Sequence, residues 1–263
     1  MRIWYQSFAR ASERGNYGEA LRVAIRAAAD PGTDIEIHAI ERGGGVGDQY
    51  RYLEYRDTRE VIENAMRAER EGFDAFLLGN ILDPGIDECR ELLRIPVLGL
   101  CETNLHIACM VGRRYGIVTV NPKFTPRILE NVRRYGLWGQ MAAVELMHVT
   151  KLSSLSTGFV AGEGQRTILD QFESAARSCL AQGAEVLFPA GGTLMALLSH
   201  LGIREVDGAP ILDGIATLLK MGETAVKLRG ILGTFTSKAL TYRPPAGDVL
   251  DEVRRFYGPD VYA

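Results

Sequence analysis

The chain has 263 residues, 46% of them hydrophobic and 24% charged, and its formal net charge is −3. This composition excludes wholesale disorder, and the slight acidic excess argues against a nucleic-acid partner. No apolar run approaches the ~20 residues that a membrane-spanning helix needs, and the N-terminus leads into a strand instead of a signal peptide. The four cysteines lack CxxC spacing, so we expect reduced thiols in a cytoplasmic globular protein that binds no membrane.

Strands and helices are predicted to alternate along the chain. The predicted strands are Ile3–Gln6, Asp34–Ile40, Ala75–Leu78, Val97–Leu100, Gly116–Val120, Ala143–His148, Val186–Phe188 and Pro210–Leu212. The predicted helices are Glu19–Ala29, Thr58–Glu71 and Asp248–Tyr257, with others near 86–93, 103–111, 126–135, 165–182, 194–200 and 214–229. This alternation predicts an α/β fold of mostly parallel sheets flanked by helices, with ligands bound beyond the carboxyl ends of the strands.

An internal repeat predicts two lobes. Residues 72–80 parallel residues 183–191, and each segment precedes a turn, a helix and a strand that begins near a proline. We expect two pseudo-symmetric Rossmann-like lobes with a cleft between them; a chance match of two common βα patterns is the alternative. The expected division is a first lobe of residues 1–100 plus 214–240, a second lobe of 101–213, and a tail of 241–263 with a short amphipathic helix. The apolar face of that helix packs either on its own chain or on a partner subunit.

Two strand-end loops are the best candidates for a ligand site, one at residues 79–85 and the other at 189–193. Backbone N–H groups at such turns can hold a carboxylate or an enolate oxygen, and glycines allow a close approach. The alternative is that both loops are tight βα turns only. The residues expected at the site from these loops are Asn80, Ile81, Leu82, Ala190, Gly191, Gly192 and Thr193.

Other polar residues also follow predicted strands. Gln6, Ser7, Thr119 and Asn121 are candidate ligand contacts, with local turn or capping bonds as the alternative. Glu102 and Asp213 are candidate general acids or bases, although helix capping or pairing with an arginine is the more common role of such carboxylates.

The remaining motifs point away from cofactors. No HxxxH or HxH spacing predicts a metal site, and the glycines at 43–47 lack the GxGxxG spacing of a dinucleotide-binding loop, so we expect no cofactor. The loop at 41–57, with Tyr50, Tyr52 and Tyr55, is interpreted as a cover for the site or as an aromatic subunit contact.

Several short segments together resemble the aspartate/glutamate/hydantoin racemase superfamily, which includes maleate isomerases and arylmalonate decarboxylases. They are the opening Met1–Ile3 strand, Asp83–Gly85, Gly116–Thr119, Gly183–Val186 and Ile211–Gly214, and the resemblance extends from residue 1 to about 230. It implies two α/β lobes with the active site between them, a homo-oligomer, and proton transfer between two cysteines on opposite faces of an acidic carbon. In this chain Asn80 stands at the first cysteine position, and Ala190 or Gly191 at the second.

The resemblance therefore implies an isomerase-type enzyme that retains the anion-binding cleft without two-cysteine proton transfer. The expected substrate is a small carboxylate or a hydantoin-like cyclic amide. Asn80, Gly191, Gly192 and Thr193 are expected to hold the oxyanion, Ser7, Thr119 and Asn121 to orient the substrate, and Glu102 or Asp213 to carry the proton. Cys101 is the alternative thiol. The alternative functions are a hydrolase or decarboxylase/lyase that uses a carboxylate-activated water, and a non-catalytic small-molecule binding protein.

Overall fold

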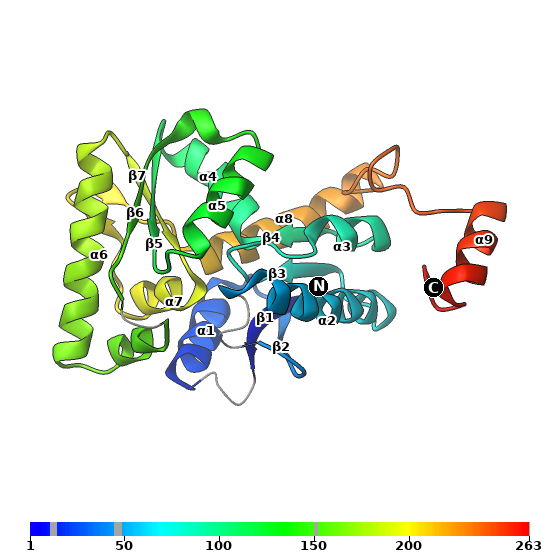
Figure 1. Cartoon of the computed structure of the whole chain (residues 1–263), viewed down its shortest axis with the longest axis horizontal. Coiled ribbons are helices and arrows are strands. Elements are labelled where there is room, and N and C mark those ends of the chain that lie inside the picture. The colour runs from blue at the N-terminus through cyan, green and yellow to red at the C-terminus, as the bar shows by residue number, and fades with distance from the viewer. Residues whose placement is uncertain (11–14, 45–48, 150–151, 263) are drawn as a thin grey trace.

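The computed structural model describes residues 1–10, 15–44, 49–149 and 152–262. Its first sheet has four parallel strands in the order β2-β1-β3-β4 (Figure 1). These are β1 (Arg2–Arg10), β2 (Asp34–Ile40), β3 (Ala75–Leu78) and β4 (Val97–Gly99). Every residue of β3 is buried, as expected for a strand covered by helices on both faces.

The second sheet has three parallel strands in the order β6-β5-β7. These are β5 (Tyr115–Thr119), β6 (Met141–Leu146) and β7 (Val186–Ala190). Beside β7, Ile211 forms a parallel bridge with Leu187, in the place that β4 takes beside β3. The strand order of the first sheet therefore recurs in the second, which confirms the predicted pair of pseudo-symmetric lobes. The predicted strand Pro210–Leu212 is reduced to this bridge and to a short antiparallel pair, β8 (Glu205–Val206) with β9 (Ala209–Pro210).

Helices connect and cover the strands, which confirms the α/β class. They are α1 (Gly15–Ala28), α2 (Arg51–Arg70), α3 (Ile86–Leu92), α4 (Leu100–Val111), α5 (Phe124–Arg134), α6 (Glu163–Ala181), α7 (Gly192–His200), α8 (Gly214–Leu232) and α9 (Asp248–Tyr257), with 3-10 turns η3 (Trp138–Gln140) and η4 (Leu152–Phe159). Figure 1 shows α6 on the outer side of the second sheet and α9 at the opposite end of the molecule.

Two helices join the lobes around a shared core. α8 packs on β3 and β4 of the first sheet although it follows the second, α4 packs on β7, and α4 and α8 pack on each other. Apolar side chains of both sheets, among them Leu77 and Ile117, belong to one continuous cluster. The limits of the lobes at residues 100 and 213 stay predictions.

The largest difference from the predicted elements is at α2. This helix begins at Arg51, seven residues before the predicted start at Thr58, so the last seven residues of the expected tyrosine loop are helical. Tyr52 and Tyr55 lie on its surface with 71% and 78% of their area exposed. Residues 45–48 of the expected loop lie outside the described residues.

Candidate active site

The structure brings together the two loops that the repeat singled out. We call residues 79–85 the β3–α3 loop and residues 190–193 the β7–α7 turn; Pro189, expected in the second loop, belongs to β7. A methyl group placed on Gly192 would lie 4.0 Å from the carbonyl oxygen of Gly79. Gly192 is also the first residue of α7, and the first N–H groups of a helix have no partner within it. The junction of the loops can therefore offer backbone donors to an anionic oxygen.

Asn80 shapes the β3–α3 loop. Its side-chain Oδ1 accepts a hydrogen bond from the backbone N–H of Leu82 at 2.8 Å, and its carbonyl oxygen accepts one from the N–H of Asp83 at 3.2 Å. Ile81 and Leu82, both expected at the site, have only 4% and 6% of their area exposed and pack in the core. The side chains of Ile81 and Leu82 therefore stabilise the loop, and these two residues can offer a ligand only their backbone.

The β7–α7 turn consists of small residues. Ala190 ends β7 and is fully buried, and Gly191 accepts a hydrogen bond from the N–H of Met195 at 2.9 Å. Thr193 lies half-buried in the first turn of α7. A ligand can approach the backbone here more closely than it could approach larger side chains.

Two tyrosine hydroxyls lie at this junction, and the sequence analysis singled out neither. A methyl group placed on Gly79 would lie 2.5 Å from Cζ and 2.6 Å from Oη of Tyr5 on β1. The hydroxyl of Tyr17 on α1 would lie 3.3 Å from a methyl group on Gly192. Tyr5 is fully buried, and burial, together with the nearby Tyr17 and Asp213, raises its pKa well above the ordinary value of 10. The sequence feature that could have identified Tyr5 was its place on one strand while a glycine, Gly79, directly follows the neighbouring strand.

Gln6 and Ser7, expected to follow the first strand, lie inside β1, and their side chains point to opposite faces as neighbours on a strand do. Gln6 accepts hydrogen bonds from Trp4 Nε1 and Asn64 Nδ2, both at 3.1 Å, inside the first lobe. Ser7, on the same face of the strand as Tyr5, is fully buried, and its Oγ accepts a hydrogen bond from the N–H of Ala9 at 3.3 Å. Of this pair, Ser7 is the residue whose strand face agrees with a place in the site.

The residues after β5 make local and interlobe bonds. Thr119 Oγ1 shares a hydrogen bond with Thr125 Oγ1 at 2.8 Å, and Asn121 Oδ1 accepts one from the N–H of Lys123 at 2.8 Å. The Nδ2 group of Asn121 donates to Gln49 of the first lobe at 2.7 Å. In this structure Thr119 and Asn121 therefore stabilise the local fold after β5, and Asn121 also links the two lobes.

The contact made by Gln49 continues along α2 and α5. Nζ of Lys123 lies 4.7 Å from the ring centroid of Tyr50, and Arg51 pairs with Glu130 at 2.6 Å. Arg127 and Glu54 form a further ion pair, with side chains only 8% and 13% exposed. We call these contacts the α2–α5 interface. The part of the expected cover from Gln49 to Glu54 therefore lies against the second lobe.

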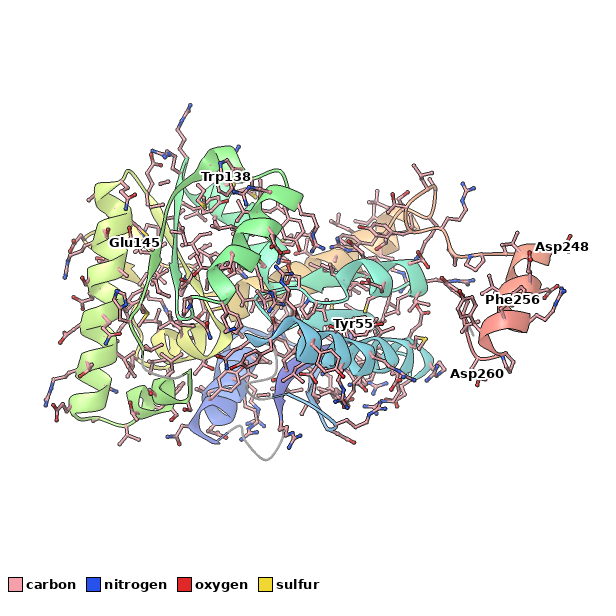
Figure 2. All side chains as sticks on the ribbon, viewed as in Figure 1. Tyr55, Trp138, Glu145, Asp248, Phe256 and Asp260 are labelled. Atoms are coloured by element: carbon pink, nitrogen blue, oxygen red, sulfur yellow. The ribbon has the colours of Figure 1, made fainter. Side chains whose placement is uncertain are left out.

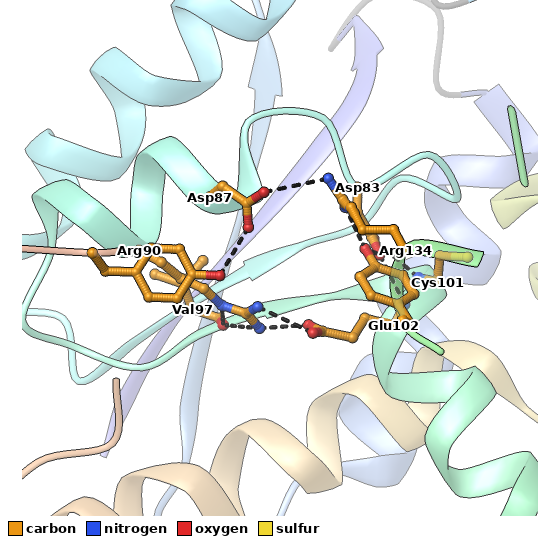
Figure 3. Close-up of polar contacts among 9 residues, drawn as sticks. Asp83, Asp87, Arg90, Val97, Cys101, Glu102 and Arg134 are labelled. Carbon is orange, nitrogen blue, oxygen red and sulfur yellow. Dashed lines mark hydrogen bonds and ion pairs between the residues drawn. The ribbon is translucent and has the colours of Figure 1, made fainter. Parts of the chain in front are cut away.

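Glu102, a predicted proton carrier, is held by an arginine. Figure 3 shows its carboxylate beside the guanidinium of Arg90, which also donates to the carbonyl oxygen of Val97. Both side chains are less than one-fifth exposed. In this structure Glu102 makes the arginine pair that the sequence analysis had given as the common alternative.

Asp83 and Cys101 belong to the same network (Figure 3). Asp83 accepts hydrogen bonds from the N–H groups of Cys101 at 3.0 Å and Glu102 at 2.8 Å, so it caps α4, and from the hydroxyl of Tyr135 at 2.8 Å. Burial raises the pKa of Asp83 to about 6. Burial and the charge of Asp83 raise the pKa of the Cys101 thiol well above 9, so this cysteine is not a thiolate at neutral pH.

Asp213, the other predicted proton carrier, lies at the start of α8. Its Oδ1 accepts from the N–H of Ala216 at 3.1 Å, its Oδ2 accepts from Ser199 Oγ at 2.8 Å, and Arg204 lies 3.5 Å away. The charge of Asp213 contributes to the raised pKa of Tyr5, and Glu102 is not among the causes of that rise. Of the two carboxylates, Asp213 is the one near the paired loops.

Two further searches concern metals and membranes. Across the described ranges, no group of three His, Cys, Asp or Glu side chains is placed to hold a metal ion. In the same part of the chain, no helix combines the length and the apolar character needed to cross a membrane.

The fold and the site define a class: two-lobed parallel α/β proteins with a candidate site where strand-end loops of the two lobes meet. Comparison with known proteins gives the family. The family model for Asp/Glu/Hydantoin racemase matches residues 16–222, so the chain belongs to the Asp/Glu/hydantoin racemase family. The chain is 28% identical over 227 residues to a hydantoin racemase of Pseudomonas sp. (strain NS671), covering 84% of each chain. It is 30% identical over 190 residues to a hydantoin racemase of Paenarthrobacter aurescens, covering 72% of this chain and 75% of that one.

Solved structures agree. The allantoin racemase from Pseudomonas fluorescens aligns with a TM-score of 0.76 and 26% identity, covering 94% of this chain and 99% of that one. The allantoin racemase from Klebsiella pneumoniae aligns with a TM-score of 0.75 and 25% identity, covering 94% and 95%. An arylmalonate decarboxylase, at 12% identity and a TM-score of 0.54, shares the fold alone.

Proposed function

We propose that the protein is a racemase-type isomerase acting on a small, hydantoin-like cyclic amide at the junction of the β3–α3 loop and the β7–α7 turn. The approach of Gly192 to the carbonyl oxygen of Gly79 carries the proposal, because it gathers a helix N-terminus and two tyrosines at one place. Donors so arranged can stabilise the negative charge that forms on a carbonyl oxygen when the neighbouring carbon loses its proton. The names of the relatives, hydantoin racemase and allantoin racemase, support a cyclic amide as the substrate class.

The proton transfer is proposed to proceed without a thiolate. Asn80 stands at the first position where the resemblance implies a cysteine and Ala190 or Gly191 at the second, and none of the three carries a group that exchanges a proton near neutral pH. Burial raises the thiol pKa of all four cysteines. We propose Asp213 as the proton carrier, because its charge reaches the junction and Glu102 is bound to Arg90. The four cysteines are unpaired, which supports a reducing compartment such as the cytoplasm.

The test is proton exchange at the acidic carbon. Enantiopure 5-substituted hydantoins are incubated in D2O with and without the protein, and circular dichroism and mass spectrometry follow configuration and deuterium content. We expect loss of optical activity and uptake of one deuterium, both faster than in buffer alone. Exchange no faster than in buffer would refute the proposal. A product with another mass change would favour the hydrolase or lyase alternative.

Two matched substitutions identify the proton carrier. Asp213→Asn keeps a good helix cap for α8 and removes the base, so we expect the rate to fall by roughly 10²–10⁴-fold with little change in stability. Glu102→Gln removes the partner of Arg90 and is expected to lower stability more than the rate. The opposite result would make Glu102 the proton carrier.

We also propose that the protein is a homo-oligomer that uses α9. Among the described residues of this helix none is buried, and Val249, Phe256 and Tyr257 are 59%, 75% and 78% exposed. Figure 2 shows Phe256 on α9, apart from the side chains of the two sheets. Exposed apolar surface of this kind marks contact sites. Phe256→Asp is expected to lower the molar mass measured by light scattering, and an unchanged mass would exclude α9 from the interface.

A further inference from the structure

Tyr5 is a buried tyrosine whose hydroxyl makes no hydrogen bond to the described residues. The residue has 0% of its area exposed, and within the part of the chain that the structure describes its Oη has no hydrogen-bond partner. Native proteins bond nearly all buried polar groups, because an unpaired hydroxyl loses its bonds to water and gains none. A buried hydroxyl left in this state therefore needs an explanation.

Another buried tyrosine of the chain, Tyr115, has a hydrogen-bond partner for its hydroxyl. Tyr115, at the start of β5 in the second sheet, is also fully buried, and its hydroxyl donates to the carbonyl oxygen of Leu137 at 2.9 Å. Tyr5 and Tyr115 are thus both buried tyrosines, and each lies on an inner strand of its sheet. They differ in that Tyr115 has a protein acceptor.

The position of the Tyr5 hydroxyl points to a ligand as its acceptor. The hydroxyl occupies the space beside Gly79 into which a methyl group would project, at 2.6 Å. The carbonyl oxygen of the same Gly79 faces Gly192 at the start of α7. The unpaired donor therefore lies where the two lobes bring their strand-end loops together.

We propose that the Tyr5 hydroxyl is a catalytic hydrogen-bond donor to the carbonyl oxygen of the bound cyclic amide, a role that rests on the function proposed above. When the C–H bond beside that carbonyl breaks, the proton goes to the base and the electron pair moves into the carbon–carbon bond, so the carbonyl oxygen becomes anionic. Tyr5 keeps its proton and donates to this oxygen. A water molecule gives a proton to the other face of the carbon, which restores the carbonyl and inverts the configuration, and the base returns the first proton to the hydroxide that this water leaves.

The electrostatics of the site agree with a donor that stays neutral. Burial raises the pKa of Tyr5, and Tyr17 and Asp213 raise it further. A phenol in such surroundings remains protonated at neutral pH and cannot act as the base. The same surroundings strengthen a hydrogen bond to an anionic oxygen, because little water competes for it.

The test compares Tyr5→Phe with Tyr115→Phe, each of which removes one hydroxyl from a buried tyrosine. The probe is enantiopure 5-benzylhydantoin, followed by circular dichroism. Loss of one donor to an oxyanion lowers kcat by roughly 10²–10³-fold. We expect this loss in Tyr5→Phe with KM changed by less than about tenfold, and rates near wild type in Tyr115→Phe. The melting temperature without ligand should be unchanged or higher in Tyr5→Phe and lower in Tyr115→Phe.

Each result judges a different claim. An active wild type with an equally active Tyr5→Phe variant would overturn the role of Tyr5 alone. A melting temperature lowered by Tyr5→Phe as much as by Tyr115→Phe would show a structural partner for the hydroxyl and overturn the role as well. A wild type that neither racemises nor exchanges any hydantoin would overturn the proposed function, and the role of Tyr5 with it.

Discussion

Replacing Arg127 by methionine is expected to destabilise the protein far more than replacing Arg51 by methionine. Both arginines pair with a glutamate across the α2–α5 interface, so the two variants remove the same type of contact between the same helices. The pairs differ in burial. The side chains of Arg127 and Glu54 are 8% and 13% exposed, whereas those of Arg51 and Glu130 are 65% and 55% exposed.

Burial sets the magnitude of each effect. Arg127→Met leaves the Glu54 carboxylate buried without its partner, which costs about 3–5 kcal/mol of the free energy of unfolding. Arg51→Met breaks a pair that water already screens, so its cost is expected to stay below about 1 kcal/mol. Replacing both members of the buried pair, with Glu54→Leu added to Arg127→Met, should recover most of the loss, because no unpaired charge remains.

Urea unfolding at 25 °C, followed by circular dichroism, measures all three free energies. The single variant Glu54→Leu, measured in the same way, completes a double-mutant cycle whose coupling energy isolates the Arg127–Glu54 contact. Equal costs for Arg127→Met and Arg51→Met would refute the reasoning, since burial would then not decide the strength of these pairs. A double variant less stable than Arg127→Met would also refute it.

Three other predictions concern the β3–α3 loop and the cysteines. The pKa of Asp83 is raised from 3.8 to about 6, so the folded protein binds more protons than the unfolded chain between these values. The free energy of unfolding should therefore fall by about 2 kcal/mol as the pH rises from 4 to 6, and Asp83→Asn should flatten this part of the profile measured by urea unfolding. Gly79→Ala should cost about 1–3 kcal/mol, because the new methyl group meets the Tyr5 ring, and Tyr5→Val in the same chain should relieve part of it; strictly additive costs would contradict the contact. Iodoacetamide at pH 7.5 should leave Cys101 unlabelled in the native protein by mass spectrometry, and labelling faster than unfolding would contradict its raised pKa.

The sequence predicted best the elements whose pattern is set by their own residues. The run of four apolar residues predicted β3, and the alternation of apolar and polar residues predicted β2. The structure has both strands at the predicted limits, because each pattern lies in the residues of the strand itself. The first turns of α2 could not be recognised in this way. Tyr52 and Tyr55 are exposed there, and Glu54 and Arg51 contact α5, which lies some seventy residues further along the chain.

The same physical reason limits what the sequence could say about the site. Glycines after two strands predicted the paired loops. A turn that another group approaches closely needs glycine, whether that group is near or far along the chain. The choice of the proposed proton carrier between Glu102 and Asp213 depended on the ion pair of Glu102 with Arg90. No local pattern in the sequence predicts that pair. The sequence analysis made no prediction for Tyr5, because nothing in the local pattern shows the contact with Gly79 or the lack of a hydrogen-bond partner among the described residues.

Asn80 stands at the first position expected to hold a cysteine, and Ala190 or Gly191 stands at the second. Asn80 fixes the β3–α3 loop through its bond to Leu82, and Gly191 adopts extended backbone that leads into α7. The shape of an anion-binding junction is thus maintained by residues that transfer no proton. Under the proposed mechanism, negative charge moves from the carboxylate of Asp213 to a substrate oxygen beside Tyr5 as the carbon is deprotonated. A neutral phenol is suited to that place, because it stabilises the new charge without adding an opposite charge that would pair with the base before the reaction.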